Sequence, residues 1–149
     1  MNGTAMRSVV VPINEGGGAD WTAQHVIGLY RQQPLRIYLL NVRQALPQYV
    51  ARFIAKSEVE SFHQENGMLA IKPVADRLDA HGVPHWDLVM VGEKAESIVR
   101  FARDHHCSQI ILPKPKAGPL AYFGLGSIGS QIRHLIGVAG ESCGVSEVY

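Results

Sequence analysis

Apolar residues along this chain occur in short continuous runs, separated by longer stretches in which they recur with helical spacing. The runs are bounded by glycine, proline or polar residues, and several are rich in β-branched side chains. Such runs indicate buried strands, and they predict strands at residues 7–13, 35–42, 85–92, 107–113 and 143–149. The second run is apolar at nearly every position, which is typical of a strand covered on both faces.

The first two stretches between the runs predict helices. Residues 21–32 begin after Asp20, a suitable N-cap residue. Side chains with helical spacing share one face of this segment: Trp21, His25, Val26, Leu29 and Tyr30. After a linker at residues 43–48, a longer helical region runs to about His81, and interruptions are expected near Pro47 and Gly67.

Two more helices follow the third and fourth runs. Residues 94–106 place an apolar stripe on one face, formed by Ile98, Val99, Phe101 and Ala102. Residues 127–139 form the last helix before the terminal strand. The regular alternation of strands and helices predicts one doubly wound α/β domain over residues 1–149, with a five-stranded parallel sheet and helices on both faces.

In sheets of this kind, ligands bind beyond the carboxyl ends of the strands. The candidate site therefore consists of the residues expected there: Pro12, Ile13, Asn14, Val42, Gly92 and the loop at 113–127. Pro12 and Ile13 either line a pocket for a base or pack as the end of a strand. Both interpretations are open at the level of sequence.

Composition narrows the classes of function. Apolar residues make up 46% of the chain and charged residues 18%, which is ordinary for a globular protein. A net charge of +1 gives no broad basic field, so we expect no nucleic acid partner. No run is long enough to span a membrane, and no secretion signal is recognisable. Cys107 and Cys143 are expected to be reduced thiols in a cytoplasmic protein.

The loop at 113–127 reads PKPKAGPLAYFGLGS and leads into the last predicted helix. Unpaired N–H groups and the positive end of the helix dipole favour anions at such a place. A phosphate site there would use Gly126, Ser127, Gly129 and Ser130. The same residues suit a plain helix start with Ser127 as N-cap, so both interpretations stand.

Three blocks of the chain resemble the universal stress protein family. They are VVVPIN in the first strand, VGEKAESIVRFARDHHCSQIIL from the third strand to the fourth, and GSIGSQIRHLI at the last helix. The resemblance extends over essentially the whole chain and implies the strand order 3-2-1-4-5. It also implies a homodimer in which the strand at 144–149, ending at Tyr149, pairs with its counterpart. The alternative is an edge left open or blunted by Glu147.

Family members that resemble ATP binders carry Gly, two residues, Gly, nine residues, and then Gly-Ser or Gly-Thr. Counting back from Gly126 puts Pro113 and Lys116 at the two leading glycines. Proline has no N–H, and the Cβ of lysine narrows the backbone conformations that glycine would allow. Lys114 and Lys116 are either solvated loop charges or point charges that meet a phosphate.

A further departure lies at the end of the first strand. Asn14 stands where the ATP binders of the family usually carry Asp. A neutral amide can hydrogen-bond a ribose or a base, but it is a poorer partner for a metal held on phosphates.

A histidine-rich group is predicted at the opposite, amino edge of the sheet. It consists of His81, His85, His105, His106 and Cys107, with Cys143 as a further member. These ligand types suit zinc or copper. Their spacing matches no known finger or catalytic signature, and histidine near a helix C-terminus is favoured by the dipole alone. Metal binding is therefore the weakest of the hypotheses for this chain.

No nucleophile elbow, intact phosphate loop or acid/base pair of carboxylates is present in the sequence, so we expect no enzyme. The leading hypothesis is a non-catalytic stress-response or interaction module whose altered nucleotide crevice does not bind ATP tightly and needs no cofactor. The alternative is a regulatory switch that binds ATP, AMP or another anion through Lys116, Gly126, Ser127 and Ser130.

Overall fold

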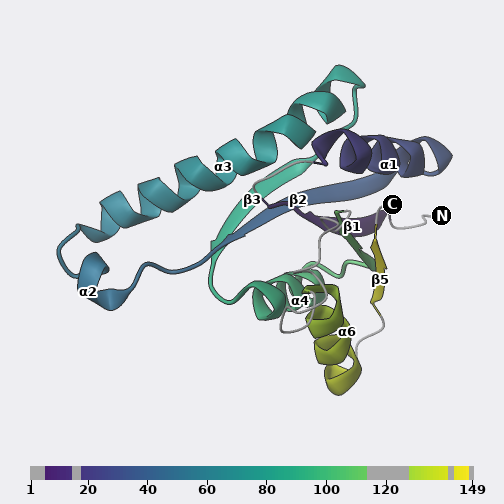
Figure 1. The fold of residues 1–149 in the computed structure, drawn as a ribbon. Helices are drawn as coiled ribbons and strands as arrows, with labels where there is room; N and C mark the ends of the chain where they lie inside the picture. The colour runs from purple at the N-terminus through teal and green to yellow at the C-terminus, as the bar shows by residue number, and fades with distance from the viewer. Residues whose placement is uncertain (1–5, 15–17, 114–127, 141–142, 148–149) are drawn as a thin grey trace, which may run out of the picture.

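The computed structural model describes residues 6–14, 18–113, 128–140 and 143–147. They form a 5-stranded sheet in the order β3-β2-β1-β4-β5, and every pair of neighbouring strands is parallel (Figure 1). The strands are β1 (Arg7–Pro12), β2 (Leu35–Arg43), β3 (Trp86–Val91), β4 (Gln109–Leu112) and β5 (Gly144–Glu147). The predicted α/β fold class and the strand order are both confirmed.

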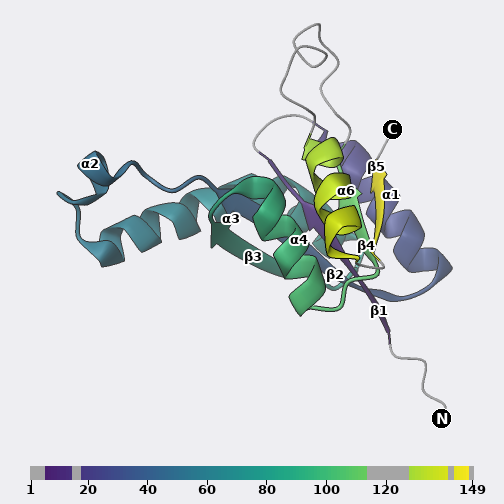
Figure 2. The same cartoon turned by 90° about the horizontal axis from the view of Figure 1, so that it is seen from below.

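Helices cover both faces of this sheet, as the two views in Figure 1 and Figure 2 show. They are α1 (Ala19–Gln32), α2 (Gln48–Ala51), α3 (Lys56–Ala80), α4 (Lys94–Asp104) and α6 (Ile128–Ala139). α1 packs beside α3 over one face, and α4 packs beside α6 over the other. Because α1, α3, α4 and α6 each join parallel strands, they start near the edge where the strands end.

The core forms one apolar layer on each face of the sheet. Successive side chains of a strand point to opposite faces, so Val9 and Ile37 face α1 and α3 while Val10 and Tyr38 face α4 and α6. The register places Val9 opposite Ile37 and Val10 opposite Tyr38. β2 lies between two other strands and is buried at nearly every position, which explains its almost continuous apolar sequence.

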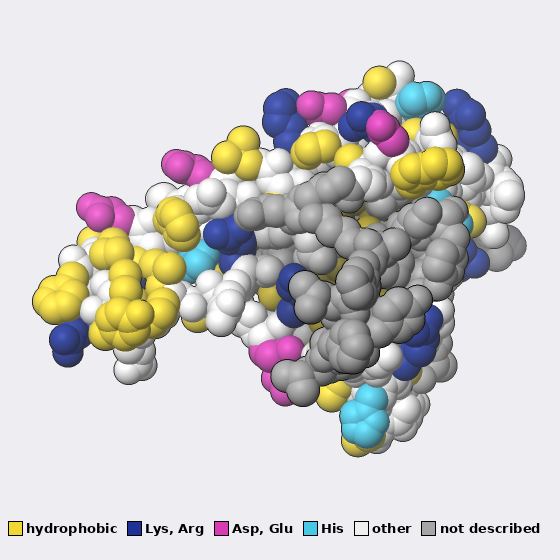
Figure 3. All heavy atoms as spheres, viewed as in Figure 1, with side chains coloured by type: hydrophobic (Ala, Val, Ile, Leu, Met, Phe, Trp, Pro, Cys, Tyr) yellow, Lys and Arg dark blue, Asp and Glu magenta, His cyan; other side chains and the backbone are white. Residues whose placement is uncertain are grey.

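The helix α3 is longer than the sheet it covers, and together with α2 it extends beyond the sheet (Figure 1). The interruption predicted near Gly67 is wrong, because α3 continues through this residue. A Cβ at Gly67 would lie 2.5 Å from Cγ2 of Val89, so the glycine lets α3 approach β3 closely. The extending part exposes large apolar side chains: Tyr49, Phe53 and Phe62. Hydrophobic side chains gather at the left end of the molecule in Figure 3, where α2 lies.

The start of α1 also differs from the prediction. Its N-cap is Gly18, whose φ of 102° lies in the left-handed region that favours glycine, and Asp20 lies inside the first turn. Trp21 and His25, predicted on the packing face, are exposed. The buried face is displaced by one position and consists of Thr22, Ala23, Val26 and Ile27.

The helix α4 follows its predicted pattern. The Glu93 carboxylate caps it by accepting hydrogen bonds from the backbone N–H groups of Ala95, at 3.3 Å, and Glu96, at 2.7 Å. Ile98, Phe101 and Ala102 are buried as expected. Within the described ranges, no helix combines the length and the apolar character needed to cross a membrane.

Candidate functional site

The carboxyl end of β1 is fixed by hydrogen bonds to β2. The backbone N–H of Ile13 donates to the Leu40 carbonyl at 2.8 Å, and the Ile13 carbonyl accepts from Nδ2 of Asn41 at 2.7 Å. Pro12 and Ile13 are buried, and the Ile13 side chain packs in the core layer beneath α1 and α3. These bonds hold the next residue, Asn14, at the edge of the sheet.

Asn14 is exposed, and its side chain is engaged by a lysine from another element. Nζ of Lys94 donates a hydrogen bond to Oδ1 of Asn14 at 3.0 Å, although the two residues are 80 positions apart. Lys94 is the first residue of α4, which follows β3. The bond therefore connects two elements at the carboxyl edge and places an ammonium group there.

Gly92 makes the connection from β3 to α4 possible. Its backbone N–H donates to the Arg43 carbonyl at 2.9 Å, which continues the pairing of β3 with β2. Its φ is 158°, and a Cβ at this position would lie 2.8 Å from Oγ of Ser97. Ser97 is almost completely buried, so it has little room to move. Glycine at position 92 therefore allows the close approach that positions the start of α4 and Lys94.

The remaining predicted site residues are only partly brought together. Val42 is buried and packs in the core layer beneath α4 and α6, so it offers its backbone rather than its side chain to a ligand. Pro113 follows β4 and is half-buried. In the first turn of α6, Gly129 is buried and Ser130 is exposed. Lys114, Lys116, Gly126 and Ser127 lie outside the described residues.

Two side chains near this edge carry buried polar atoms without hydrogen-bond partners, and neither residue was singled out from the sequence. His63 in α3 is 4% exposed and neither ring nitrogen has a partner, while Oδ1 of Asn41 is also unsatisfied. Burial, and secondly the charge of Arg43, lower the pKa of His63 below its usual value. The ring is therefore neutral at physiological pH. Buried polar groups without partners are uncommon in proteins and mark this end of the sheet as imperfectly satisfied.

The histidine-rich amino edge has a different character. The ring of His85 lies between two carboxylates, with Nδ1 donating to Oδ1 of Asp87 at 2.6 Å and Nε2 donating to Oδ1 of Asp79 at 2.7 Å. Burial by itself would lower the pKa of His85, but the two carboxylates more than offset it and the pKa is raised. These bonds tie the end of α3 to the start of β3.

The other members of this group also have partners of their own. His105 stacks on Phe101, with ring centroids 3.9 Å apart, and its Nδ1 donates to the Phe101 carbonyl at 3.0 Å. Nδ1 of His81 donates to the Arg77 carbonyl at 2.9 Å.

Cys107 is buried, and burial together with the neighbouring Cys143 raises the pKa of its thiol to about 12. His106 takes a positive φ of 53°. Over the described ranges, which include every histidine and cysteine of this group, no three His, Cys, Asp or Glu side chains are gathered as a metal ion would require.

Strand ends, a glycine turn and the start of a helix meet at this edge of the sheet. This arrangement is typical of doubly wound α/β proteins, a class that binds ligands beyond the carboxyl ends of the strands. Comparison with known proteins gives the family: a match to the Universal stress protein family covers residues 6–136. The chain belongs to this family. No curated protein matches the chain.

Solved structures share the fold over nearly the full length of the chain. A universal stress family protein from Burkholderia pseudomallei is 17% identical, with a TM-score of 0.64 and coverage of 99% of this chain and 98% of that one. The universal stress protein from Archaeoglobus fulgidus in complex with dAMP is 15% identical, with a TM-score of 0.60 and coverage of 97% and 98%. A family protein from Arabidopsis thaliana with AMP bound is 13% identical, with a TM-score of 0.60 and coverage of 95% and 90%.

Proposed function

We propose that this chain is a cytoplasmic, dimeric universal stress protein that acts as a non-catalytic stress-response or interaction module. In this proposal its nucleotide crevice is altered and does not bind ATP tightly. The observation that carries the proposal is the hydrogen bond from Nζ of Lys94 to Oδ1 of Asn14. Oδ1 is the acceptor that the amino group of a base or the hydroxyl of a ribose would need at this position.

Two physical arguments support an altered crevice. A ligand that donates to Oδ1 of Asn14 has to share this oxygen with the Lys94 ammonium or displace it, and a displaced ammonium would lose its partner in the first turn of α4. A cation in the first turn is already disfavoured by the helix dipole, so this displacement costs free energy. The neutral Asn14 amide also binds a metal–phosphate complex more weakly than a carboxylate does.

The second candidate function is a regulatory switch that binds ATP, AMP or another anion. It is favoured by solved relatives of the same fold, which were crystallised with AMP and dAMP. In this alternative, Lys94 and Lys116 are point charges for phosphate, and the start of α6 supplies backbone donors together with Gly126, Ser127 and Ser130.

Calorimetric titration of the full chain with Mg-ATP and with AMP separates the two functions. The altered crevice predicts no measurable heat for the unmodified protein at submillimolar ligand. Tight binding of either nucleotide would overturn it. Release of inorganic phosphate from ATP, measured in the same samples, tests the non-catalytic part of the proposal, and turnover that depends on the protein would contradict it.

Variants sharpen this titration. If Lys94 and Lys116 obstruct the crevice, Lys94→Met and Lys116→Gly should each strengthen nucleotide binding. If they hold phosphate, the same substitutions should weaken it. Arg100→Met removes another exposed cation from α4 and is the matched control, which should leave binding unchanged under both functions.

The dimer in this proposal uses the edge strand β5. β5 pairs with β4 on one side, in the register Gly144 with Gln109 to Glu147 with Leu112. It is the last of the described strands in the sheet order, and none of the other described strands pairs with its outer side, where we place a second copy related by a two-fold axis. Analytical ultracentrifugation should give twice the 16.3 kDa chain mass. A monomer throughout the accessible concentration range would contradict this arrangement.

A further inference from the structure

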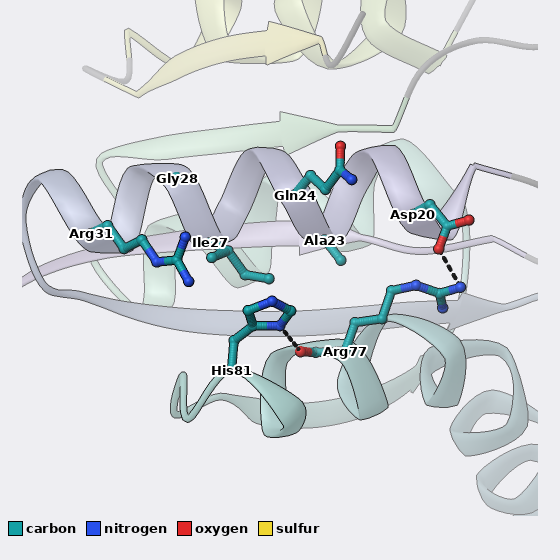
Figure 4. A pocket seen from close by; sticks show the side chains of 8 residues that line it. All are labelled: Asp20, Ala23, Gln24, Ile27, Gly28, Arg31, Arg77 and His81. Carbon is teal, nitrogen blue, oxygen red and sulfur yellow. Dashed lines mark hydrogen bonds and ion pairs between the residues drawn. The ribbon is translucent and has the colours of Figure 1, made fainter.

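A groove separates the outer surfaces of α1 and α3 (Figure 4). Its volume is about 470 Å³, within the range of sites that bind small molecules in proteins. Its lining comes entirely from these two helices and the residue after α3: Asp20, Ala23, Gln24, Ile27, Gly28, Arg31, Arg77 and His81. None of these residues is among the candidate residues of the nucleotide crevice.

The floor of the groove is apolar. Ala23 and Ile27 are buried side chains of α1 that pack into the core. Gly28 follows them, and a Cβ added to it would meet no other atom within 4 Å. No steric contact therefore requires glycine there, although glycine within a helix costs about 1 kcal/mol relative to alanine. The missing side chain widens the groove.

Two side chains on the α3 side are held in place. The Arg77 guanidinium pairs with the Asp20 carboxylate across the groove, and its Nη1 donates to the Pro73 carbonyl at 2.8 Å. The Arg77 carbonyl accepts from Nδ1 of His81 at 2.9 Å. Because a carbonyl can only accept, Nδ1 carries the proton of the neutral ring, and Nε2 faces the space between the helices (Figure 4).

Arg31 supplies a cation from the opposite side. Its side chain extends from α1 into the space between the helices (Figure 4). Among the described residues it has neither a hydrogen-bond partner nor an ion-pair partner, whereas the charge of Arg77 is balanced by Asp20. The groove thus combines an apolar floor with one uncompensated guanidinium on its rim. A guanidinium presents two parallel N–H donors that match a carboxylate.

We propose that the α1–α3 groove binds a small organic carboxylate with a flat apolar body. The apolar body of this ligand lies beside Ile27 and over the open position at Gly28, and its carboxylate accepts two hydrogen bonds from Arg31. A phosphate dianion fits less well, because Asp20 already engages the second guanidinium of the groove. This site is independent of nucleotide binding in the crevice.

The test is an NMR titration of the ¹⁵N-labelled full chain with naphthalene-2-carboxylate as the probe. Saturable shifts are expected for the backbone amides of residues 23–31 and 77–81. The neutral analogue 2-naphthamide has the same body without the charge and should bind about tenfold more weakly. Equal binding of both compounds, or shifts confined to other parts of the chain, would overturn the proposal.

Two substitutions at one position provide a matched pair. Gly28→Leu fills the groove and should abolish the shifts, whereas Gly28→Ala leaves most of the space open and should retain them. Both should remain folded, because both residues favour a helix more than glycine does. Arg31→Gln should weaken binding of the carboxylate about tenfold without affecting the amide. Unchanged carboxylate binding in Gly28→Leu or in Arg31→Gln would refute the site.

Discussion

The two edges of the sheet hold histidines in opposite environments. His63, near the carboxyl edge, is buried with no hydrogen-bond partner, and its pKa is lowered. His85, at the amino edge, is held between two carboxylates, and its pKa is raised. The amino edge has more histidines, although it was the weaker candidate for ligand chemistry in the sequence, and His81, His85 and His105 bond there to carboxylates or backbone carbonyls.

We infer from this difference that the carboxyl edge has more side-chain atoms left for a ligand. Hydrogen bonds and ion pairs between the side chains of an edge stabilise the fold and leave fewer groups for a ligand. The carboxyl edge has the unsatisfied atoms of His63 and Asn41, and it has the bond from Lys94 to the Asn14 oxygen that the proposed ligand would use. Three substitutions test the comparison.

The largest effect is expected for Gly92→Ala at the carboxyl edge. The new Cβ would lie 2.8 Å from the buried Oγ of Ser97, and the φ of 158° is unfavourable for alanine. The free energy of unfolding should fall by about 2–3 kcal/mol. Urea unfolding measures this change, with Gly28→Ala as the matched control because its Cβ enters open space and should stabilise the protein. Equal stability of Gly92→Ala and the unmodified protein would mean that the turn is not constrained as described.

His63→Leu should change the free energy of unfolding in the opposite direction, toward higher stability. Replacing a buried ring without hydrogen bonds by an apolar side chain should raise the free energy of unfolding by about 1–2 kcal/mol. Because the folded-state pKa of His63 is lowered, the unfolded chain takes up a proton first, and stability is lost as the pH falls below about 6.5. The variant should lack this loss.

Chemical unfolding at pH values on both sides of the ordinary histidine pKa measures both effects of His63→Leu. His25→Leu replaces an exposed histidine of α1 and should change stability by less than about 0.5 kcal/mol. A destabilised His63→Leu protein would show that the buried ring has a partner that holds it in place.

The smallest effect is expected for His85→Gln at the amino edge. The glutamine keeps a hydrogen-bonding side chain but loses the positive charge between Asp79 and Asp87, which should cost about 1 kcal/mol. Because the folded-state pKa of His85 is raised, its stabilisation is complete below about pH 6.5 and is lost as the pH rises through the folded-state value. The free energies of unfolding of the variant and of the unmodified protein should therefore converge at alkaline pH. A difference in stability that grows with pH would contradict the charge pairing.

Much of the fold followed from the pattern of apolar residues, and the errors have identifiable causes. The strands were found because their continuous apolar runs are needed to cover a parallel sheet on both faces. The helix break at Gly67 was wrong because the glycine is used for close packing on Val89, a contact between distant segments. The cap of α1 was misplaced because a left-handed Gly18 begins the helix without a side-chain bond.

The candidate site was predicted less completely. Asn14 and Gly92 were identified because the ends of parallel strands lie at a common edge. Lys94 and His63 were missed because a lysine at a helix start and a histidine within a helix have no distinctive local pattern. The groove was also missed, since Gly28 and Arg31 gain significance only when α3 lies beside α1.

By itself, the sequence determined the succession of strands and helices, the parallel sheet and the family, because apolar periodicity and motif spacing are local properties of a chain. Only the tertiary structure decided which polar groups meet. Lys94 reaches Asn14 across 80 positions, Asp20 pairs with Arg77, and His63 is enclosed without a hydrogen-bond partner. Such contacts depend on how helices are rotated and displaced on the sheet, and packing of the whole core sets those positions.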